Sequence, residues 1–579
     1  MAGEPVIRGM ILAAGYGTRL APVTDHLPKP LLSVGEGTLL DHALAAFERA
    51  GISEVAVNTH HLGGMIASHL QQRKETKQVT VFHEDEILGT GGALDGARSF
   101  LEAADHFIVF NGDVLCNVDL SALMAAHLKH GNLGTMLLVD RPRFNTVHVN
   151  EKLSVVHIDG AGPLDEKSIP PGCKALTYAG VGIFSRAILD DIGPGFSSLI
   201  SPLVRSLAAQ CDSVKGFEAD GVFWDDLGTL HSYLKVSQDL LQNPKKFQWL
   251  GEGTTFTGGP LDLKLITGHG SDRKFWRLST TDWSAVAMQS ATDKPGNEEF
   301  QYQLDIGRFL HRHDLGTAEV LSVDAAGGTM LMEDLGQASL FFLGRNPGTP
   351  EHLLAQSYRQ VVDHLLKLQS FTDTARQQCP SAVERCLDYD VLRWETAYFR
   401  EQFLHRHLGL KEEETRHLLP VFEDLANCVA HQPQVLLHRD FQSQNIHFHK
   451  GKVRLVDIQG LRLGPIGYDI MSLVWDPYVD LPDGLRDELL DRFAAGCAGQ
   501  SDDTRAMCVA AGLQRLMQAL GAYGFLGHAK MKQEFLAHIP RGVANLKALL
   551  KTARTLYGDR AAFLPDSLSL LESFLKSHG

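Results

Sequence analysis

The sequence lacks the usual marks of a disulfide-rich, nucleic-acid-binding or membrane-spanning protein. Its eight cysteines include no C-x-x-C pair, which argues against a zinc site and against a disulfide framework. A formal net charge of -15 argues against nucleic acid as a partner, because phosphate backbones need a basic surface. No apolar run is long enough to cross a bilayer, and the start, Met-Ala-Gly-Glu-Pro, does not open a signal peptide. We therefore expect a cytoplasmic protein with neither nucleic acid nor a membrane as partner.

Internal repeats and low-complexity stretches are also missing. The hydrophobic share of 44% and the charged share of 21% are ordinary for a globular protein. A chain of 579 residues is too long for one hydrophobic core, so we expect more than one domain. The acidic excess still allows phosphorylated substrates, because magnesium ions can bridge carboxylates to phosphates.

Residues 6–240 alternate strand-like apolar runs with amphipathic helical runs. Strands are predicted over Val6–Ala13, Glu54–Asn58 and Phe107–Asn111, and a helix over Leu39–Ala50. This alternation predicts a largely parallel sheet that binds ligands at the carboxyl ends of its strands.

A turn-rich stretch, Asn243–Pro260, interrupts the alternation and predicts a domain boundary. Beyond it comes a short β-rich region and then a long helical one, the outline of a two-lobed kinase. The predicted ranges are 1–246 for the first domain, 247–579 for the second, and within the second about 258–336 for the small lobe and about 337–579 for the large lobe.

A glycine-rich turn follows the first predicted strand. The strand Met10–Ala13 leads into Gly15 and Gly17, where the missing side chains let backbone N–H groups approach a triphosphate. Arg19 can place a planar guanidinium on phosphate oxygens, and Lys29, between two prolines, adds a second positive charge. The combined spacing L-A-A-G-x-G-x-R-x(9)-K-P predicts a nucleotide site.

Two aspartates lie where a magnesium-bound nucleotide would sit. Asp113 follows the apolar strand that ends at Asn111, and Asp226 lies in the run W-D-D-L-G-T. Two hard oxygen ligands on separate elements suit a magnesium ion held against phosphates.

These motifs resemble the sugar-phosphate nucleotidyltransferase family over about the first 240 residues, and within it the uridylyltransferases of N-acetylmuramic acid 1-phosphate. The resemblance implies an α/β Rossmann-like fold and an attack of the sugar 1-phosphate on the nucleotide α-phosphate, driven by positioning and charge neutralisation. It implies nucleotide binding by Ala13, Gly15, Gly17, Thr18, Glu84 and Gly91, sugar binding by Asn111 and Gly180, catalytic charge neutralisation by Arg19 and Lys29, and magnesium binding by Asp113 and Asp226.

A second motif lies two hundred residues further on. The run H-R-D-F-Q-S-Q-N matches the kinase catalytic loop H-x-D-x-x-x-x-N. Its spacing predicts that Asp440 accepts the proton of an acceptor hydroxyl and that Asn445 binds magnesium. Asp457, in D-I-Q-G, is predicted to be the second metal ligand.

The predicted small lobe carries the expected ATP-binding residues, but the usual lysine is missing. The strand Ala285–Gln289 lies where kinases carry that phosphate-binding lysine and has none. Candidates for the replacement cation are Arg273, Lys274, Arg277 and Lys294. ATP binding is predicted for Gly270, Ser271 and Arg273 in a glycine-rich hairpin and for Glu333 and Leu335 at the hinge between lobes.

Residues 258–579 resemble the aminoglycoside phosphotransferases, which implies a protein-kinase-like α+β domain. The pattern G-S-x-R-x-F-x-R resembles the kinases that phosphorylate N-acetylmuramic acid and N-acetylglucosamine at the anomeric position, which also lack the lysine. The two halves then imply one series: ATP phosphorylates a free amino sugar, and the sugar 1-phosphate reacts with UTP, or another nucleoside triphosphate, in peptidoglycan recycling.

Three alternatives remain open from the sequence. One is a choline kinase joined to a phosphocholine cytidylyltransferase, and another is a hexose or heptose kinase joined to a guanylyltransferase. In the third, one half only senses a nucleotide, although both sets of predicted ligands are intact.

Overall fold

The computed structural model describes two compact units. The described residues are 5–73, 78–161, 169–210, 212–219, 221–250, 259–266, 273–290, 298–497, 501–557 and 571–574. The first unit comprises residues 1–266, 275–289 and 322–329, and the second comprises 267–274, 290–321 and 330–579. The boundary at residue 246 stays a prediction.

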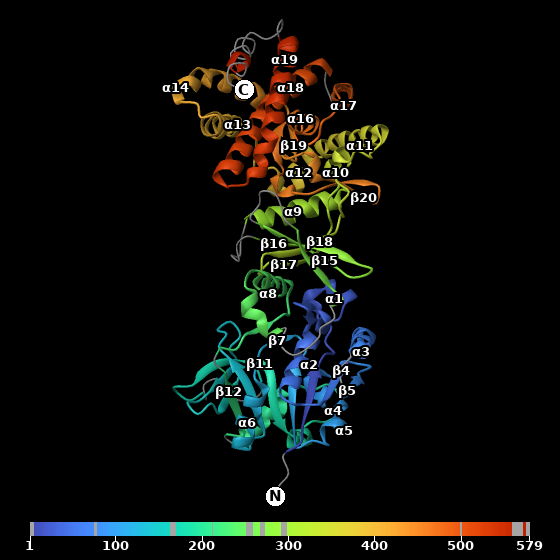
Figure 1. Ribbon diagram of the computed structural model, residues 1–579, viewed down its shortest axis with the longest axis vertical. Coiled ribbons are helices and arrows are strands. Elements are labelled where there is room, and N and C mark those ends of the chain that lie inside the picture. The colour runs from blue at the N-terminus through green and yellow to red at the C-terminus, as the bar shows by residue number, and fades with distance from the viewer. Residues whose placement is uncertain are drawn as a thin grey trace. The chain divides into compact units, whose positions relative to one another are not determined.

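A mixed sheet forms the centre of the first unit (Figure 1). Within the described residues it has nine strands in the order β10-β9-β11-β6-β1-β4-β5, with β8 between β11 and β12. The strands are β1 (Ile7–Leu12), β4 (Glu54–Thr59), β5 (Gln78–His83), β6 (His106–Asn111), β8 (Gly134–Val139), β9 (Val147–Val149), β10 (Val155–Ile158), β11 (Lys174–Ser185) and β12 (Val214–Glu218).

The prediction of a largely parallel sheet is right for only part of this sheet. The neighbours β5, β4, β1 and β6 run parallel, but the long strand β11 pairs antiparallel with β6, β8 and β9. The carboxyl ends of β1, β4 and β6 therefore meet at one edge, with Leu12 opposite both Asn58 and Asn111.

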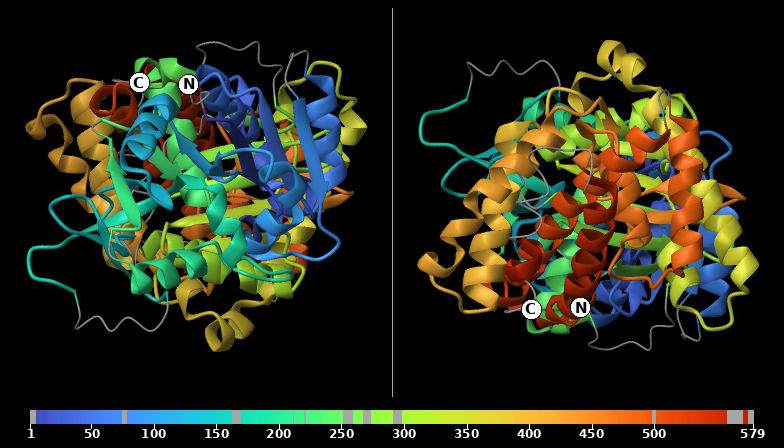
Figure 2. Two further views of the ribbon diagram at one scale, coloured as in Figure 1. Left: turned by 90° about the horizontal axis from the view of Figure 1, so that it is seen from below. Right: turned by 90° about the horizontal axis from the view of Figure 1, so that it is seen from above.

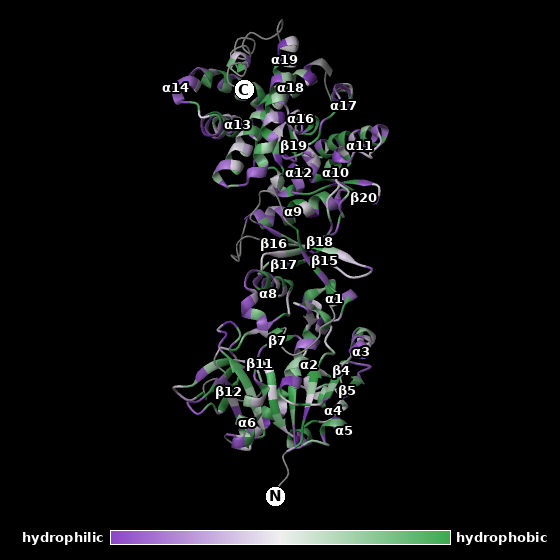
Figure 3. Ribbon diagram, in the orientation of Figure 1, coloured by the Kyte–Doolittle hydropathy of each residue, from purple (hydrophilic) through white to green (hydrophobic). Residues whose placement is uncertain are grey.

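Helices cover this sheet because their apolar faces must be buried. Helix α2 (Leu39–Arg49) begins at Thr38, whose side chain accepts from the Asp41 N–H while Asp41 accepts from the Thr38 N–H. This reciprocal capping satisfies two N–H groups at the helix start. The strands of the sheet are largely apolar, and polar residues lie mainly on the helices and loops around them (Figure 3). The other helices include α3 (Gly63–Gln72), α4 (Gly89–Gly96), α6 (Leu120–His130), α7 (Ile200–Ala209) and α8 (Leu230–Gln242).

A second sheet follows, as the β-rich region after residue 260 predicts. Its strand order is β14-β15-β16-β18-β17 among the described residues. The strands are β14 (Asp262–Ile266), β15 (Lys274–Ser279), β16 (Ser284–Gln289), β17 (Val320–Asp324) and β18 (Thr329–Glu333). Helix α9 (Glu298–Arg312) is the only helix described between β16 and β17.

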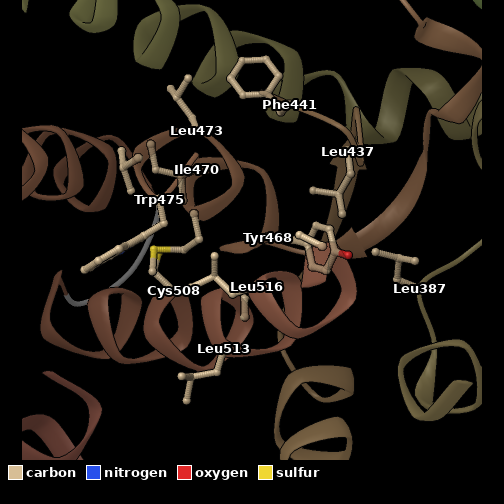
Figure 4. Packing of buried hydrophobic residues seen from close by; sticks show 14 of the residues in the cluster. Leu387, Leu437, Phe441, Tyr468, Ile470, Leu473, Trp475, Cys508, Leu513 and Leu516 are labelled. Carbon is tan, nitrogen blue, oxygen red and sulfur yellow. The ribbon is translucent and has the colours of Figure 1, made fainter. Parts of the chain in front are cut away.

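The chain after β18 is mainly helical, with the helices packed around one apolar core of the second unit. Figure 4 shows Tyr468 between Leu437 and Leu516, with Phe441 and Trp475 in the same core. Helices α18 and α19 pack side by side (Figure 2). The main elements are α11 (Glu351–Ser370), α13 (Tyr389–Phe399), α15 (Leu419–Ala430), α16 (Tyr468–Val474), α17 (Asp483–Gly496), α18 (Ser501–Gly524), α19 (Ile539–Tyr557) and strands β19 (Gln434–Leu437), β20 (Ile446–His449), β21 (Lys452–Leu455) and β22 (Arg462–Pro465). In the part of the chain that the structure describes, no helix combines the length and apolarity that crossing a bilayer requires.

Candidate active sites

The first unit has a cavity of about 340 Å³ at the carboxyl ends of β1, β4 and β6. Most of the residues predicted to bind nucleotide and metal line it. These are Ala13, Gly15, Gly17, Thr18, Arg19, Lys29, Glu84, Asn111 and Asp113. Asn58, Ile87, Gly89, Thr90 and Gly228 also line it.

Lys29 joins the two predicted metal ligands. Its buried ammonium lies 2.7 Å from Asp113 Oδ2 and 3.5 Å from Asp226 Oδ1. Arg19 Nη2 approaches Asp226 from the other side at 3.6 Å. The carboxylates therefore converge around one cation, although Asp113 and Asp226 are more than a hundred residues apart. Such a group can neutralise charge that builds up on phosphates in the transition state.

A buried hydrogen-bonded chain fixes the turn after β1. Asn58 accepts from the Ala13 N–H at 2.8 Å and donates to Glu84 Oε1 at 2.7 Å. Glu84 Oε2 accepts from the Leu88 N–H at 3.0 Å. Asn58 and Glu84 therefore fix the glycine-rich turn relative to the loop before α4. Because these polar groups are buried, loss of one of them would leave its partner without a hydrogen bond and destabilise the fold.

Two glycines allow close contacts with residues that line the cavity. Gly180 has a φ of 74°, and a Cβ there would lie 2.8 Å from the Asn111 amide nitrogen. A Cβ on Gly228 would collide with Arg19 and lie 2.8 Å from Asp226 Oδ1. Gly91 is not among the lining residues, although it follows Thr90, which is, and its N–H donates to the Ser197 carbonyl. Its predicted role at the nucleotide stays a prediction.

The second unit presents the catalytic loop predicted from the sequence. Asp469 accepts from the N–H groups of His438 and Arg439, at 2.6 and 3.0 Å. Arg439 adopts a φ of 77°, which is strained for a residue with a side chain, so these two bonds hold an unfavourable backbone in place. Asn445 donates its side-chain amide to the Asp440 carbonyl at 2.9 Å, which closes the loop.

Asp440 lies among positive charges. Arg515 Nη2 lies 3.5 Å from Asp440 Oδ1, and the side chain of Asp440 is 33% exposed. Burial alone would raise the pKa of Asp440, but the charges of Arg439 and Arg515 outweigh it and hold that pKa below its usual value. The carboxylate is therefore ionised at neutral pH and able to accept a hydrogen bond from a hydroxyl.

Asp457 lies beside the loop and is paired. Arg273 Nη2 lies 2.7 Å from Asp457 Oδ1, which also accepts from the Gln459 side chain at 2.8 Å. Of the candidate cations, Arg273 is thus placed at the predicted metal ligand. Gly270, Ser271 and Lys294 lie outside the described residues.

The predicted hinge lies at the end of β18. Glu333 pairs with Lys450 at 3.1 Å and with His449 at 3.3 Å, and its N–H donates to the Glu319 carbonyl. Leu335 is buried two residues later. The side chain of Glu333 is thus held by the β20–β21 hairpin, and its contact with ATP stays a prediction.

The donor sets suit magnesium. At the first site two carboxylates already share one cation, and at the second an aspartate and an asparagine oxygen lie on adjoining loops. No cluster of three or more metal-binding side chains occurs among the described residues, so substrate phosphates or water would have to complete either shell. Asp113, Asp226, Asn445 and Asp457 are the residues that would hold such ions.

An α/β unit with a cation-bridged carboxylate pair and a second unit with a kinase-type loop define a transferase of two domains. The nucleotidyl transferase family model matches residues 8–243, and the phosphotransferase enzyme family (APH) model matches residues 262–507. The N-terminal part of the chain therefore belongs to the nucleotidyl transferase family, and the C-terminal part carries a phosphotransferase (APH) domain. The fused architecture and the fold class predicted from the sequence are confirmed.

Several known proteins are similar to the N-terminal part of the chain. The chain is 30% identical over 264 residues to the mannose-1-phosphate guanylyltransferase catalytic subunit beta of Xenopus tropicalis, covering 44% of this chain and 71% of that protein. The corresponding Drosophila melanogaster protein is 30% identical over 243 residues, covering 40% of this chain and 64% of that protein. HddC from Yersinia pseudotuberculosis, solved in complex with GMP-PN, has a TM-score of 0.34 and 24% identity over 40% of this chain and 99% of that chain.

Proposed function

We propose that this chain converts a free sugar into a nucleotide sugar in two successive reactions. The observation that carries the proposal is the presence of two ligand sets in one chain, Lys29 with Asp113 and Asp226, and Asp440 with Asn445 and Asp457. The product of a sugar kinase is the substrate of a sugar-1-phosphate nucleotidyltransferase, so the two activities form one route.

In the first reaction the anomeric hydroxyl attacks the γ-phosphate of ATP. The hydroxyl proton passes to the Asp440 carboxylate, the new O–P bond forms, and ADP leaves. Asp440 suits this role because Arg515 keeps it ionised and its loop is anchored by Asp469. Arg273 supplies the positive charge that the missing lysine supplies in other kinases.

In the second reaction a phosphate oxygen of the sugar 1-phosphate attacks the α-phosphate of a nucleoside triphosphate and pyrophosphate leaves. The nucleophile is already an anion, so no protein base is required. Arg19 and Lys29 lie where negative charge would build up. A magnesium ion held by Asp113 and Asp226 would add further charge neutralisation.

The sugar and the base have two candidate identities. The resemblance of the kinase part supports an amino sugar, N-acetylmuramic acid or N-acetylglucosamine, with UTP as the nucleotide. The guanylyltransferase names of the relatives support GTP with a mannose-type sugar.

One incubation separates these candidates. The full chain is given ATP, magnesium, a panel of free sugars together with choline, and either UTP, GTP, CTP or dTTP, and the nucleotide-linked products are detected by mass spectrometry. A UDP-amino sugar supports the first candidate and a GDP-sugar the second. Formation of a CDP-choline-type product, or of none at all, contradicts the proposal.

A further inference from the structure

Three arginines of the second unit gather beside the catalytic loop, and the two proposed reactions assign them no role. Arg439 precedes Asp440, Arg462 opens β22, and Arg385 lies just before α13. They are called the arginine cluster below. Arg515, which contacts Asp440 directly, is not part of it.

Strand pairing brings the cluster together. Strands β19 and β22 run antiparallel, with Leu437 opposite Arg462, so Arg462 lies across from the chain that enters the catalytic loop. On the other side of β22, the Leu463 N–H donates to the Arg385 carbonyl at 3.0 Å. The three arginines thus come from adjacent segments that are up to 77 positions apart in the chain (from 385 to 462).

Neutral carbonyl groups hold two of the guanidiniums. Arg385 Nη2 donates to the carbonyls of Gln459 and Leu461, at 2.6 and 3.1 Å, and Arg462 Nε donates to the Gly460 carbonyl at 2.9 Å. Both guanidiniums are therefore fixed at the turn that follows Asp457. Of the described residues, none forms an ion pair with a guanidinium of the cluster, and the buried Arg385 Nε has no hydrogen-bond partner.

Nearby carboxylates compensate the positive charge of the cluster only in part. Burial, together with the charges of Arg439 and Arg385, lowers the pKa of Arg462 to about 10. Asp440 and the buried Glu395 attract Arg439, but the Glu395 carboxylate accepts from Tyr468 and Gln514.

Two further carboxylates, Glu384 and Glu299, attract Arg385, and both are exposed. Their pull is weakened by solvent. A bound anion would relieve the repulsion inside the cluster, and a carboxylate or phosphate matches the fork of a guanidinium.

We propose that Arg385, Arg439 and Arg462 bind a negatively charged substituent, carboxylate or phosphate, on the sugar that the kinase part phosphorylates. The inference rests on the proposed sugar-kinase function and narrows its substrate class. All three residues come from the large lobe, and the charges of Arg439 and Arg462 act on Asp440, which is proposed to meet the acceptor hydroxyl. The groups predicted for ATP, by contrast, include Arg273 and Glu333, which precede the large lobe in the chain.

Matched pairs of sugars test this inference on the full chain. N-acetylmuramic acid differs from N-acetylglucosamine by a carboxylate-bearing ether, and mannose 6-phosphate differs from mannose by a phosphate. We expect the wild type to phosphorylate one charged member with a kcat/KM at least about tenfold above that of its neutral partner. Which pair shows the preference distinguishes carboxylate from phosphate.

Substitution of single arginines of the cluster tests whether they cause the preference for the charged sugar. In Arg462→Gln and Arg385→Gln we expect the ratio of charged to neutral kcat/KM to fall by about 10- to 100-fold, mainly through KM for the charged sugar. Arg359→Gln is the matched control, because Arg359 is exposed and pairs with Glu488 on the surface. It should leave the ratio unchanged. Circular dichroism identifies any variant that fails to fold, and the milder Arg462→Lys, which keeps the charge, then takes its place.

Three outcomes overturn the inference. If the wild type has equal kcat/KM values for the charged and the neutral sugars, the inference is wrong, while the sugar-kinase proposal stands. A rise in KM for ATP, with an unchanged sugar ratio, would assign the cluster to the nucleotide phosphates. Phosphorylation of no sugar by the folded wild type rejects the inference and the proposed function together.

Discussion

Arg273 Nη2 lies 2.7 Å from Asp457 Oδ1, which places a guanidinium at the predicted metal ligand of a kinase that has no lysine in its β16 strand. Replacing Arg273 with glutamine should lower kcat/KM for ATP by about 10- to 100-fold, because a charge-assisted contact is lost. Steady-state kinetics with ATP and a free sugar measure this. Conversion of supplied sugar 1-phosphate should stay unchanged in the same preparation.

Lys274, the next residue and another candidate cation, provides the control. Lys274→Gln should change ATP kinetics less than twofold, because no pairing of Lys274 with Asp457 is found in the described structure. A larger loss in Lys274→Gln than in Arg273→Gln would assign the cation to Lys274.

Removal of the carboxylate of Asp113 or Asp226 should abolish nucleotide-sugar formation without affecting sugar phosphorylation. Asp113→Ala and Asp226→Ala each leave Lys29 without one of its partners and leave a magnesium ion with one carboxylate fewer. Nucleotide-sugar formation should fall by at least about a hundredfold, the scale of losing one electrostatic group at a phosphoryl centre. Sugar phosphorylation by ATP should continue, as mass spectrometry of the accumulating sugar 1-phosphate would show.

The exposed Asp190→Asn serves as the control for both variants and should alter neither activity. Loss of sugar phosphorylation in either carboxylate variant would contradict the assignment of two separate sites.

The local elements of the first unit could be predicted closely from the sequence. The strand expected over Val6–Ala13 is β1, Ile7–Leu12, and the helix expected over Leu39–Ala50 is α2, Leu39–Arg49. Both follow from short-range patterns of apolar residues and caps. The antiparallel insertion of β11 could not be predicted, because its partners β6 and β8 lie far away in the chain and periodicity does not encode pairing.

Some residues of the two sites could be predicted from the sequence, and others could not. Asp113, Asp440 and Asp457 belong to short motifs with fixed spacing, so the sequence singled them out. Arg385, Arg462 and Arg515 belong to no motif, and only the folded chain places them around the catalytic loop. The spacing of the sequence motifs predicts neither the ion pair of Asp457 with Arg273 nor the hydrogen bond of Asn58 to Glu84.

A buried carboxylate in the first unit predicts a pH-dependent stability. Burial alone would raise the pKa of Asp41, but the hydrogen bond and charge of His69 and the hydrogen bonds from Thr38 lower it to about 2 from an ordinary 3.8. Because the folded-state pKa is the lower one, ionised Asp41 stabilises the fold above pH 3.8. This stabilisation is lost as the pH falls from 3.8 toward 2.

The shift corresponds to about 2 kcal/mol in the free energy of unfolding. Asp41→Asn should therefore lower the unfolding temperature at pH 7, and the difference from the wild type should shrink as the pH approaches 2. Differential scanning calorimetry of the full chain measures both. A difference that stays constant across this range would show that Asp41 acts through packing rather than through charge.

Asp440→Asn tests the proton acceptor of the kinase. The substitution keeps the size of the side chain and removes its charge and basicity, so conversion of free sugar should fall by about 10²- to 10⁴-fold. Conversion of supplied sugar 1-phosphate should be nearly unchanged. Product yields from the two starting compounds, measured in one preparation, decide between a kinase role and a structural one. Equal losses from both would indicate a structural role.

The last prediction concerns the independence of the two parts. The residues proposed for the first site lie between Ala13 and Asp226, and the family matches leave 244–261 between them, so we expect a fragment of residues 1–246 to convert sugar 1-phosphate alone. The complementary fragment, 247–579, should phosphorylate free sugar. Residues 275–289 are nevertheless grouped with the first compact unit, so a fragment of residues 1–289 is the informative comparison. If 1–246 is insoluble or inactive while 1–289 is active, the first domain needs residues from 247–289 and the boundary at residue 246 is wrong. Equal activity of both fragments would support that boundary.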